Sequence, residues 1–411
     1  MENFLIKAKN AAKIIANLKP SFKTKVLHEF ATCIRQNHSA IIGANALDLK
    51  HAINNNLSFS MIDRLKLNQG RIEAMAKAVE EIAALREPLG RVLDGWVVPN
   101  GLRIEKVTTP IGVVGIIYES RPNVTSDTAA LCFKSGNICV LKGGKEAERS
   151  NKAIVVAIQE ALRRFDLPIE AVSLLPDSSR EGVAQLIKMD KYVDVIIPRG
   201  GESLINFICK NSTIPVVKHD KGVCHVYIDN EADIKKATDI TINAKCSRPS
   251  ACNALETLLV HKDIAGEILP KLKEAFLETG TELRGCQNTA KIIEVKDATE
   301  DDYGHEYLDN ILSIKIVDSL EEAIEHIGKY GSLHSEVIIT ENYTKAEKFT
   351  QDIDAACVYV NASSRFTDGG EFGFGAEVGI STNKLHARGP MGINELTTYK
   401  YKIYGEGQIR R

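Results

Sequence analysis

Short, nearly uninterrupted apolar runs alternate with amphipathic stretches from residue 111 onward. Such runs are typical of parallel strands buried on both faces, and parallel neighbours need a crossover, usually a helix, between them. The alternation therefore predicts an α/β fold whose parallel sheets are covered by helices on both faces. The expected strands lie at 111–118, 137–142, 171–176, 193–198, 214–218, 223–228, 254–260, 291–295, 311–317, 336–340 and 357–360.

These strands form two sets, which predicts two domains in a chain of 411 residues. We expect the first domain over 1–224, the second over 225–365, and a C-terminal segment over 366–411. The residues before about 90 show the apolar spacing of helices. Between about 95 and 110, Pro-Asn-Gly separates two β-prone runs. This pattern predicts a hairpin, and a protruding ribbon of this kind often makes oligomer contacts.

The charge balance excludes several classes of partner. The chain has 52 Lys and Arg against 54 Asp and Glu, a net charge of -2, which provides no field for nucleic acid or an anionic membrane. It has no run of about 18 apolar residues, and its N-terminus alternates charged with apolar residues where a signal peptide would be continuously apolar. We therefore expect a cytoplasmic protein that acts on small molecules.

Nine cysteines are scattered along the chain without a C-x-x-C pair, and no H-x-x-x-H or clustered carboxylate pattern occurs. Zinc sites and redox disulfides normally need such pairs or clusters. We expect no metal site, and we expect most of the thiols to be reduced and buried.

Two expected strands end in a glycine pair directly ahead of a helix, Gly143 and Gly144 after the first and Gly200 and Gly201 after the second. Glycine lets a ligand approach the backbone, and a helix N-terminus offers N–H groups and positive dipole to a pyrophosphate. The pairs therefore predict a dinucleotide site. Neither pair matches G-x-G-x-x-G or the Walker A spacing, which argues against a kinase.

Lys142 and Lys145 flank the first glycine pair. Cationic side chains at this place can hold the 2′-phosphate of an adenine ribose, which favours NADP(H) over NAD(H). The choice between the two cofactors stays open at this stage.

Cys252 is the candidate nucleophile among the nine thiols. Arg248, Pro249 and Ser250 form a turn just before it, and an apolar strand begins at Ala254. A thiol in a loop at the entrance of a strand, close to an arginine, is readily deprotonated and open to substrate. Four of the other eight, Cys132, Cys139, Cys209 and Cys357, lie within apolar runs, where the role of a small core residue is the ordinary one, and Cys246 stays open as an alternative.

Five segments, at 115–127, 222–229, 247–260, 317–338 and 386–401, carry a resemblance to a known family. Over nearly its whole length the chain resembles the aldehyde dehydrogenase superfamily and, within it, the gamma-glutamyl phosphate reductase family. The resemblance implies a cofactor domain and a catalytic domain, both of Rossmann type, a small oligomerisation ribbon, and a C-terminal segment that returns to the cofactor domain. The family signature lies in 317–338, with the expected spacing of Ala323, His326, Tyr330, Gly331, Ser332, His334, Ser335 and Glu336.

The resemblance also implies catalytic roles for two residues. Cys252 would be the nucleophile. Asn123 would be the side-chain donor that, with the backbone N–H of Cys252, holds an oxyanion.

Four further residues would bind the cofactor. Lys142 matches the superfamily lysine at the adenine ribose, and Gly200 and Gly201 match the turn under the dinucleotide. Glu306 falls where superfamily members place the glutamate that binds the nicotinamide ribose, although its surroundings depart from the usual motif.

One departure from the superfamily pattern is informative. Where hydrolytic aldehyde dehydrogenases have a general-base glutamate in an E-L-G-G segment, this chain has His219, Asp220, Lys221 and Gly222. Without that base, water should attack a thioester poorly, so phosphate is the expected exchange partner.

The implied activity is therefore NADPH-dependent reduction of L-glutamyl 5-phosphate to L-glutamate 5-semialdehyde and phosphate, the second step of proline biosynthesis from glutamate. Arg248, Arg365 and Lys384 are candidates for binding the phosphate and the substrate carboxylate, on the evidence of their loop positions. The resemblance further implies a homodimer or homotetramer and raises channelling of the substrate from glutamate 5-kinase.

Two alternatives stay open. The first is an aldehyde dehydrogenase that oxidises a free aldehyde without phosphate. The second is a non-catalytic relative that keeps the fold, against which the presence of Cys252, Asn123 and both glycine pairs argues.

Overall fold

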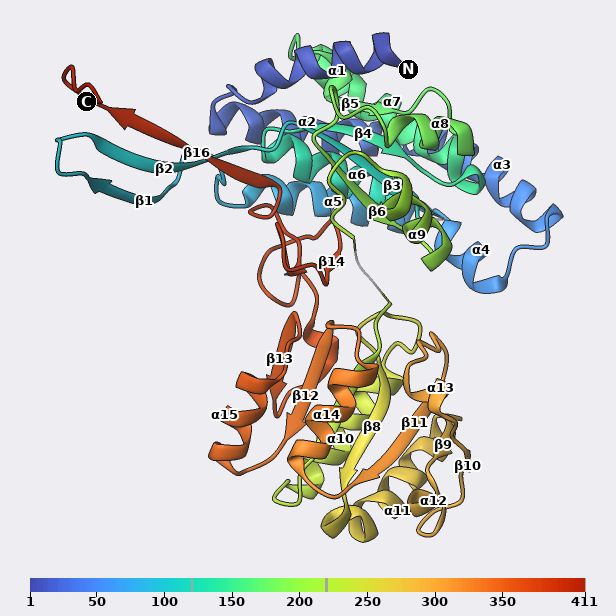
Figure 1. Cartoon of the computed structure of the whole chain (residues 1–411). Helices are drawn as coiled ribbons and strands as arrows, with labels where there is room; N and C mark the ends of the chain where they lie inside the picture. The colour runs from blue at the N-terminus through green and yellow to red at the C-terminus, as the bar shows by residue number, and fades with distance from the viewer. Residues whose placement is uncertain (120, 219–220, 411) are drawn as a thin grey trace. The chain divides into compact units, whose positions relative to one another are not determined.

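The chain forms two compact units in the computed structural model, which describes residues 1–119, 121–218 and 221–410 (Figure 1). The first unit comprises Met1–Lys218, Gly373–Gly379 and Leu385–Arg411, and the second comprises His219–Phe372 and Ile380–Lys384. The second unit thus begins earlier than residue 225, and the C-terminal segment is shared between the two units.

Helices fill the chain before the first strand, as the apolar spacing predicts. The buried face of the first helix consists of small or branched aliphatic side chains at helical intervals, such as Leu5, Ala8 and Ile15. Among the described helices, none combines the length and apolar composition that a membrane span requires. The helices of this region are α1 (Glu2–Ile15), α2 (Pro20–Gln36), α3 (His38–Asn54), α4 (Phe59–Leu65) and α5 (Gln69–Ala84).

A parallel four-stranded sheet forms the centre of the first unit, in the order β5-β4-β3-β6. All six residues of β3 are buried, as its apolar sequence predicts. The expected strand at 214–218 is reduced to a single bridge between Val216 and Ile196. The strands are β3 (Val113–Tyr118), β4 (Ile138–Lys142), β5 (Val172–Leu174) and β6 (Val195–Arg199), and the helices are α6 (Pro122–Lys134), α7 (Glu148–Arg164), α8 (Arg180–Leu186) and α9 (Glu202–Asn211).

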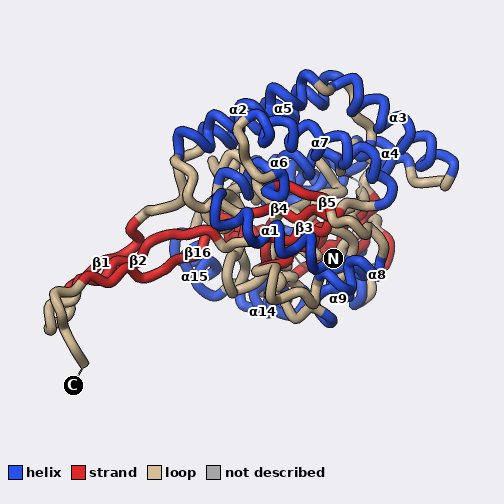
Figure 2. The backbone as a smooth tube through the Cα atoms, turned by 90° about the horizontal axis from the view of Figure 1, so that it is seen from above, coloured by secondary structure: helices blue, strands red, loops and turns tan. Residues whose placement is uncertain are grey.

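A three-stranded antiparallel ribbon projects from the first unit (Figures 1 and 2). It contains β1 (Val92–Val97), β2 (Arg103–Pro110) and, from the far end of the chain, β16 (Thr397–Tyr404), with β2 in the middle. The hairpin predicted near 95–110 is confirmed, and Gly101 donates its N–H to the Val98 carbonyl in the turn. Gly101 has a φ of +89°, which favours glycine.

The second unit is built on a parallel seven-stranded sheet in the order β10-β9-β11-β8-β7-β12-β13. Together with the first sheet it confirms the predicted α/β class with two parallel-sheet domains. The strands are β7 (Cys224–Ile228), β8 (Leu255–His261), β9 (Glu282–Gly285), β10 (Lys296–Asp297), β11 (Ile311–Val317), β12 (Ser335–Ile339) and β13 (Cys357–Val360).

Helices cover both faces of this sheet. The first face packs against α10 (Ile234–Cys246) and α11 (Lys262–Glu278), and the second packs against α14 (Leu320–Tyr330) and α15 (Tyr343–Asp352). The second unit also contains α12 (Gln287–Ala290), α13 (Glu300–Tyr303), β14 (Ile380–Ser381) and a 3-10 helix at Ser364–Phe366, and the first unit also contains β15 (Gly389–Pro390) and 3-10 helices at Lys145–Ala147 and Ile169–Ala171.

The prediction of a strand at 291–295 is wrong. This segment forms a turn and a loop after α12, and Ile293 and Val295 pack against the core without joining the sheet. The strand that occupies this part of the sheet is β9, whose sequence ELRG contains one large apolar residue.

Candidate active site

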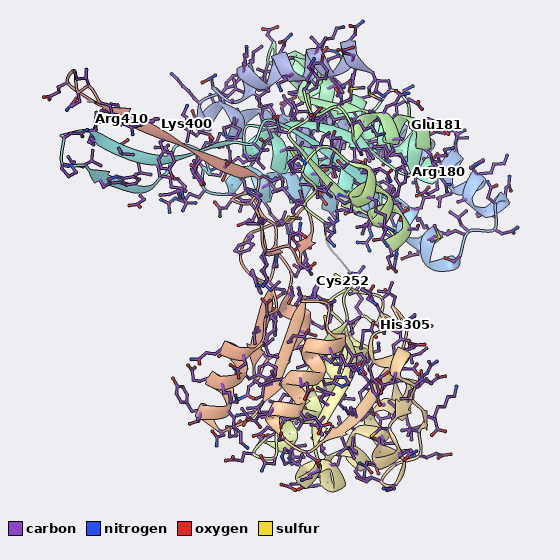
Figure 3. The ribbon with its side chains drawn as sticks, in the orientation of Figure 1. Arg180, Glu181, Cys252, His305, Lys400 and Arg410 are labelled. Atoms are coloured by element: carbon purple, nitrogen blue, oxygen red, sulfur yellow. The ribbon has the colours of Figure 1, made fainter. Side chains whose placement is uncertain are left out.

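Cys252 lies in the loop that joins α10 to β8, at the amino end of a buried parallel strand (Figure 3). The thiol is half-buried. The next residue anchors the loop to the segment after β13, because the Asn253 side chain donates to the Thr367 carbonyl at 2.8 Å and Ser364 Oγ donates to the Asn253 carbonyl at 2.7 Å. The nucleophile candidate therefore sits on a loop that is fixed from a second element.

Arg365 lies within electrostatic reach of both Arg248 and the Cys252 thiol. Arg365 donates from Nε to Ser247 Oγ at 3.1 Å. Burial lowers the pKa of Arg365, the positive charge of Arg248 lowers it further, and negative charge on Cys252 opposes the shift. Two guanidinium groups in one region, one of them interacting with the thiol, can hold an anionic substrate group. Lys384, the third candidate, forms an ion pair with Asp354 at 2.5 Å.

The carbonyl of Cys252 is enclosed by the start of β7. A Cβ atom on Gly222 would lie 1.7 Å from the Cys252 carbonyl oxygen, so only glycine fits there. Cys224, fully buried, donates from Sγ to the same oxygen at 3.4 Å. Glu306, predicted at the nicotinamide ribose, accepts the N–H of Gly222 at 2.8 Å. Glu306 is thus linked through Gly222 to the backbone of the nucleophile.

The residues that replace the general-base glutamate are only partly described. Lys221 donates from Nζ to the Gly304 carbonyl at 2.7 Å, on the protein surface. His219 and Asp220 lie outside the described residues. In the described ranges, no three His, Cys, Asp or Glu side chains gather as metal ligands would.

Asn123 lies in the first unit, at the second position of α6, with an exposed side chain. Its amide donates to Asp127 Oδ2 at 3.2 Å, one turn further along the helix. Burial raises the pKa of Asp127 to about 6, and the hydrogen bond from Asn123 opposes that shift. Asp127 therefore fixes the orientation of the Asn123 amide, with one N–H of that amide pointing to the Asp127 carboxylate.

Both glycine pairs lie at the carboxyl ends of strands that flank β3, namely β4 and β6. From β3 the chain moves to β4 and β5 on one side and then returns to β6 on the other side. In open α/β sheets such a reversal of direction creates the crevice where nucleotides bind. The strand order thus places both glycine pairs at the switch point where the sequence predicts a dinucleotide site.

The first pair, Gly143 and Gly144, cannot be replaced by larger residues without displacement of neighbours. A Cβ on Gly143 would lie 2.0 Å from Asn151 Nδ2, and a Cβ on Gly144 would lie 2.0 Å from Glu146 Oε1. Lys145 follows the pair and is exposed.

Lys142 is surrounded by charged groups of both signs. Burial lowers its pKa, Glu146 and Glu119 oppose this shift, and Lys145 and Arg180 add to it. Three cations therefore gather beside the first glycine pair, a composition that fits a phosphorylated ligand. Figure 3 labels Arg180, which begins α8 and which sequence reasoning missed, because no local motif links it to residues about 40 positions earlier.

The second glycine pair is in contact with a carboxylate side chain of the protein itself. Glu119, at the end of β3, accepts the N–H of Gly201 at 2.9 Å, and Gly201 caps α9. A Cβ on Gly200 would lie 2.8 Å from the Glu119 carboxyl carbon. A carboxylate thus occupies the helix N-terminus predicted for a phosphate, which shows that this position favours an oxyanion. Sequence reasoning missed Glu119, whose one signal is its place at the carboxyl end of a central strand.

Comparison with known proteins gives matches over the whole chain. Residues 1–292 match the Aldehyde dehydrogenase family. The chain is 64% identical to the gamma-glutamyl phosphate reductase of Wolinella succinogenes over 411 residues, which cover 100% of both proteins. Its structure matches that of the gamma-glutamyl phosphate reductase of Thermotoga maritima with a TM-score of 0.97 and 48% identity, covering 100% of this chain and 99% of the other. An acetylating aldehyde dehydrogenase of Geobacillus thermoglucosidasius shares the fold, with a TM-score of 0.70, 20% identity, and coverage of 100% and 97%.

Proposed function

The chain belongs to the gamma-glutamyl phosphate reductases of the aldehyde dehydrogenase family, and from this premise we propose that it reduces L-glutamyl 5-phosphate with NADPH. The products are L-glutamate 5-semialdehyde and phosphate, in the second step of proline biosynthesis from glutamate. The observation that supports this proposal most is the half-buried thiol of Cys252, which interacts with Arg365, itself in reach of Arg248.

In the proposed reaction the Cys252 thiolate attacks the γ-carbonyl of the substrate, the acyl–phosphate bond breaks, and phosphate leaves with the bonding electrons. The nicotinamide cofactor, when bound, supplies the hydride that reduces the resulting thioester. The backbone N–H of Cys252 and, by resemblance to the family, the amide of Asn123 stabilise the negative oxygen of the hemithioacetal. Its collapse releases the semialdehyde and the thiolate.

Arg248 and Arg365 hold the phosphate in this proposal. A planar guanidinium group binds phosphate through two parallel hydrogen bonds, and Arg365 interacts both with Arg248 and with the thiol that the phosphate must approach. Their positive charge also stabilises the departing phosphate, whose negative charge grows as the acyl bond breaks.

All the proposed cofactor residues except Glu306 belong to the first unit. Gly200 and Gly201 support the pyrophosphate at the N-terminus of α9, and Lys142 with Lys145 holds the adenine ribose and its 2′-phosphate, which selects NADP(H). From the second unit, Glu306 supplies a carboxylate for the nicotinamide ribose.

The reverse reaction gives the sharpest test. Purified protein should reduce NADP⁺ in the presence of glutamate 5-semialdehyde only when phosphate or arsenate is added, and NAD⁺ should serve less well. Cys252→Ser should abolish turnover, whereas Cys286→Ser, a second half-buried thiol of the same unit, should retain it. Turnover without phosphate would favour an enzyme that oxidises free aldehydes, and an inactive wild-type protein would favour a non-catalytic relative.

We also propose that the ribbon makes contacts between copies of the chain in a homodimer or homotetramer. All six residues of β1 are exposed, including Val92, Leu93, Trp96 and Val97, and both outer strands of the ribbon have one open edge. Exposed apolar strands with open edges normally pair with another chain. Sedimentation should show an oligomer that Val97→Lys dissociates, whereas an unchanged oligomer in this variant would exclude the role.

A further inference from the structure

The family signature forms a row of contacts with the residues next to the nucleophile. Ser332 accepts the backbone N–H of Val223 at 2.9 Å. His334 Nδ1 lies 3.6 Å from Cys224 Sγ. The next alternate residue, Glu336, contacts His225, so that residues 332, 334 and 336 each hold one residue of 223–225.

The strongest of these contacts is a buried pair of ionisable groups. Glu336 Oε2 accepts the backbone N–H of His225 and contacts its ring Nδ1, both at 2.9 Å, and both side chains are fully buried. Glu336 Oε1 has no hydrogen-bond partner within the described structure, and neither has His225 Nε2. Burial raises the pKa of Glu336, and His225 opposes this shift. Burying a carboxylate in this way is unfavourable, so core stability alone does not account for the residue.

Cys224, the central residue of the segment that the signature holds, touches the nucleophile, and so does Gly222, which directly precedes that segment. Cys224 donates to the Cys252 carbonyl, and Gly222 packs against the same oxygen. A shift of β7 toward or away from β12 would therefore move the peptide of Cys252. Gly331 allows the close approach of the signature loop, because a Cβ there would lie 2.5 Å from the Ile327 carbonyl and 3.1 Å from Glu336 Oε1.

We propose that Ser332, His334 and Glu336 are positioning residues for Cys252, acting through residues 222–225 to fix the backbone of the nucleophile. The inference rests on the proposed function, in which Cys252 is the nucleophile. None of the three touches substrate in this role. Each holds one residue of 223–225, the segment whose Cys224 touches the Cys252 carbonyl, and a displacement of about 1 Å at a reacting group can lower a rate about 100-fold.

Cys252 alkylation measures this positioning directly. The wild type and its variants are treated with iodoacetamide across a pH series, and modification at Cys252 is followed by tandem mass spectrometry, with folding checked by circular dichroism. Glu336→Ala should slow alkylation of Cys252 at neutral pH about tenfold and move its pH midpoint upward, because the thiol loses its place beside Arg365. Glu336→Gln keeps an acceptor for His225 and should stay within about twofold of the wild type.

A milder variant and a matched control keep the test decisive. Ser332→Ala removes one half-buried hydroxyl and should slow alkylation about threefold. The control, Thr340→Val, removes the buried hydrogen bond from Thr340 Oγ1 to Asp229 Oδ2 at 2.8 Å. This bond links the chain at the carboxyl ends of β7 and β12, at the opposite end from the signature contacts. The variant should leave the alkylation profile unchanged.

Two results would overturn the proposal. In the first, folded Glu336→Ala and Ser332→Ala proteins are alkylated at Cys252 as fast as the wild type. In the second, Thr340→Val slows alkylation as much as Glu336→Ala and Ser332→Ala do. The signature residues would then stabilise the sheet as a whole and would have no specific effect on Cys252. Reductase activity is followed in the same samples. If alkylation of Cys252 leaves wild-type activity intact, Cys252 is not the nucleophile, and the proposed function fails together with this inference.

Discussion

Lys245→Met should destabilise the second unit in a pH-dependent way. Lys245 lies in the last turn of α10 and donates to Glu256 Oε2 in β8 at 2.7 Å, and both side chains are fully buried. The pair therefore joins the two elements on either side of the Cys252 loop. Removing one member of a buried ion pair typically costs about 3–5 kcal/mol, because the other charge stays in the interior without a partner.

The carboxyl group can escape part of this cost by taking up a proton. Burial raises the pKa of Glu256 to about 7 even with Lys245 beside it, against about 4.3 in an unfolded chain. A raised carboxyl pKa contributes stability that is fully present below about pH 4.3 and is lost as the pH rises to the folded value. Without Lys245 the pKa of Glu256 must rise above 7, so the variant keeps losing stability at pH values where the wild type no longer does.

The difference between the two proteins should therefore widen above pH 7 by about 1.4 kcal/mol per pH unit. Between pH 7 and pH 8.5 this amounts to about 2 kcal/mol, or a further fall of about 4–8 °C in the melting temperature of a domain of this size. Thermal unfolding by circular dichroism at these two pH values measures the effect. In the double variant Lys245→Met, Glu256→Gln the gap to the wild type should not change with pH. A gap in Lys245→Met that is the same at both pH values would refute the reasoning.

Three further predictions concern the proposed site. Lys145→Glu should raise the KM for NADPH about tenfold and leave the KM for NADH within about twofold, because only NADPH carries the 2′-phosphate. Equal changes in the two KM values would contradict the assignment of Lys145 to the 2′-phosphate. Arg365→Gln should raise the KM for glutamyl phosphate about tenfold at an unchanged cofactor KM, and steady-state kinetics with normal substrate affinity would exclude the contact. Asn123→Ala should lower kcat about 100- to 1000-fold while NADPH binding, measured by fluorescence titration, stays the same, and a loss below threefold would remove Asn123 from the oxyanion site.

The sequence predicts most of the two sheets because a buried parallel strand needs apolar side chains on both faces. The same rule fails near a sheet edge. Three of the four residues of β9 are only half-buried, so its sequence lacks an apolar run, whereas the apolar run at 291–295 packs against the core as a loop. An apolar run therefore reports burial, and burial does not require strand pairing.

Site features differ in the same way. The glycine pairs and the turn before Cys252 are local patterns, so their place in the sequence is enough to find them. The contact of Glu119 with Gly201 depends on β6 lying beside β3, and the pairing of Glu336 with His225 depends on β12 lying beside β7. The order of the strands in the sheet decides these partners. No short segment of a single sequence specifies that order, so these contacts could not be predicted.

The ribbon has a spectroscopic consequence. Trp96 is the one tryptophan of the chain, it is 40% exposed on β1, and its ring centroid lies 6.2 Å from that of Tyr401 on β16. Light absorbed selectively by tryptophan is therefore emitted from this ribbon alone. The emission should shift to shorter wavelength when another chain covers the indole, so that assembly can be followed without an added dye. The same signal is blind to unfolding of the second unit, for which circular dichroism is the appropriate measurement.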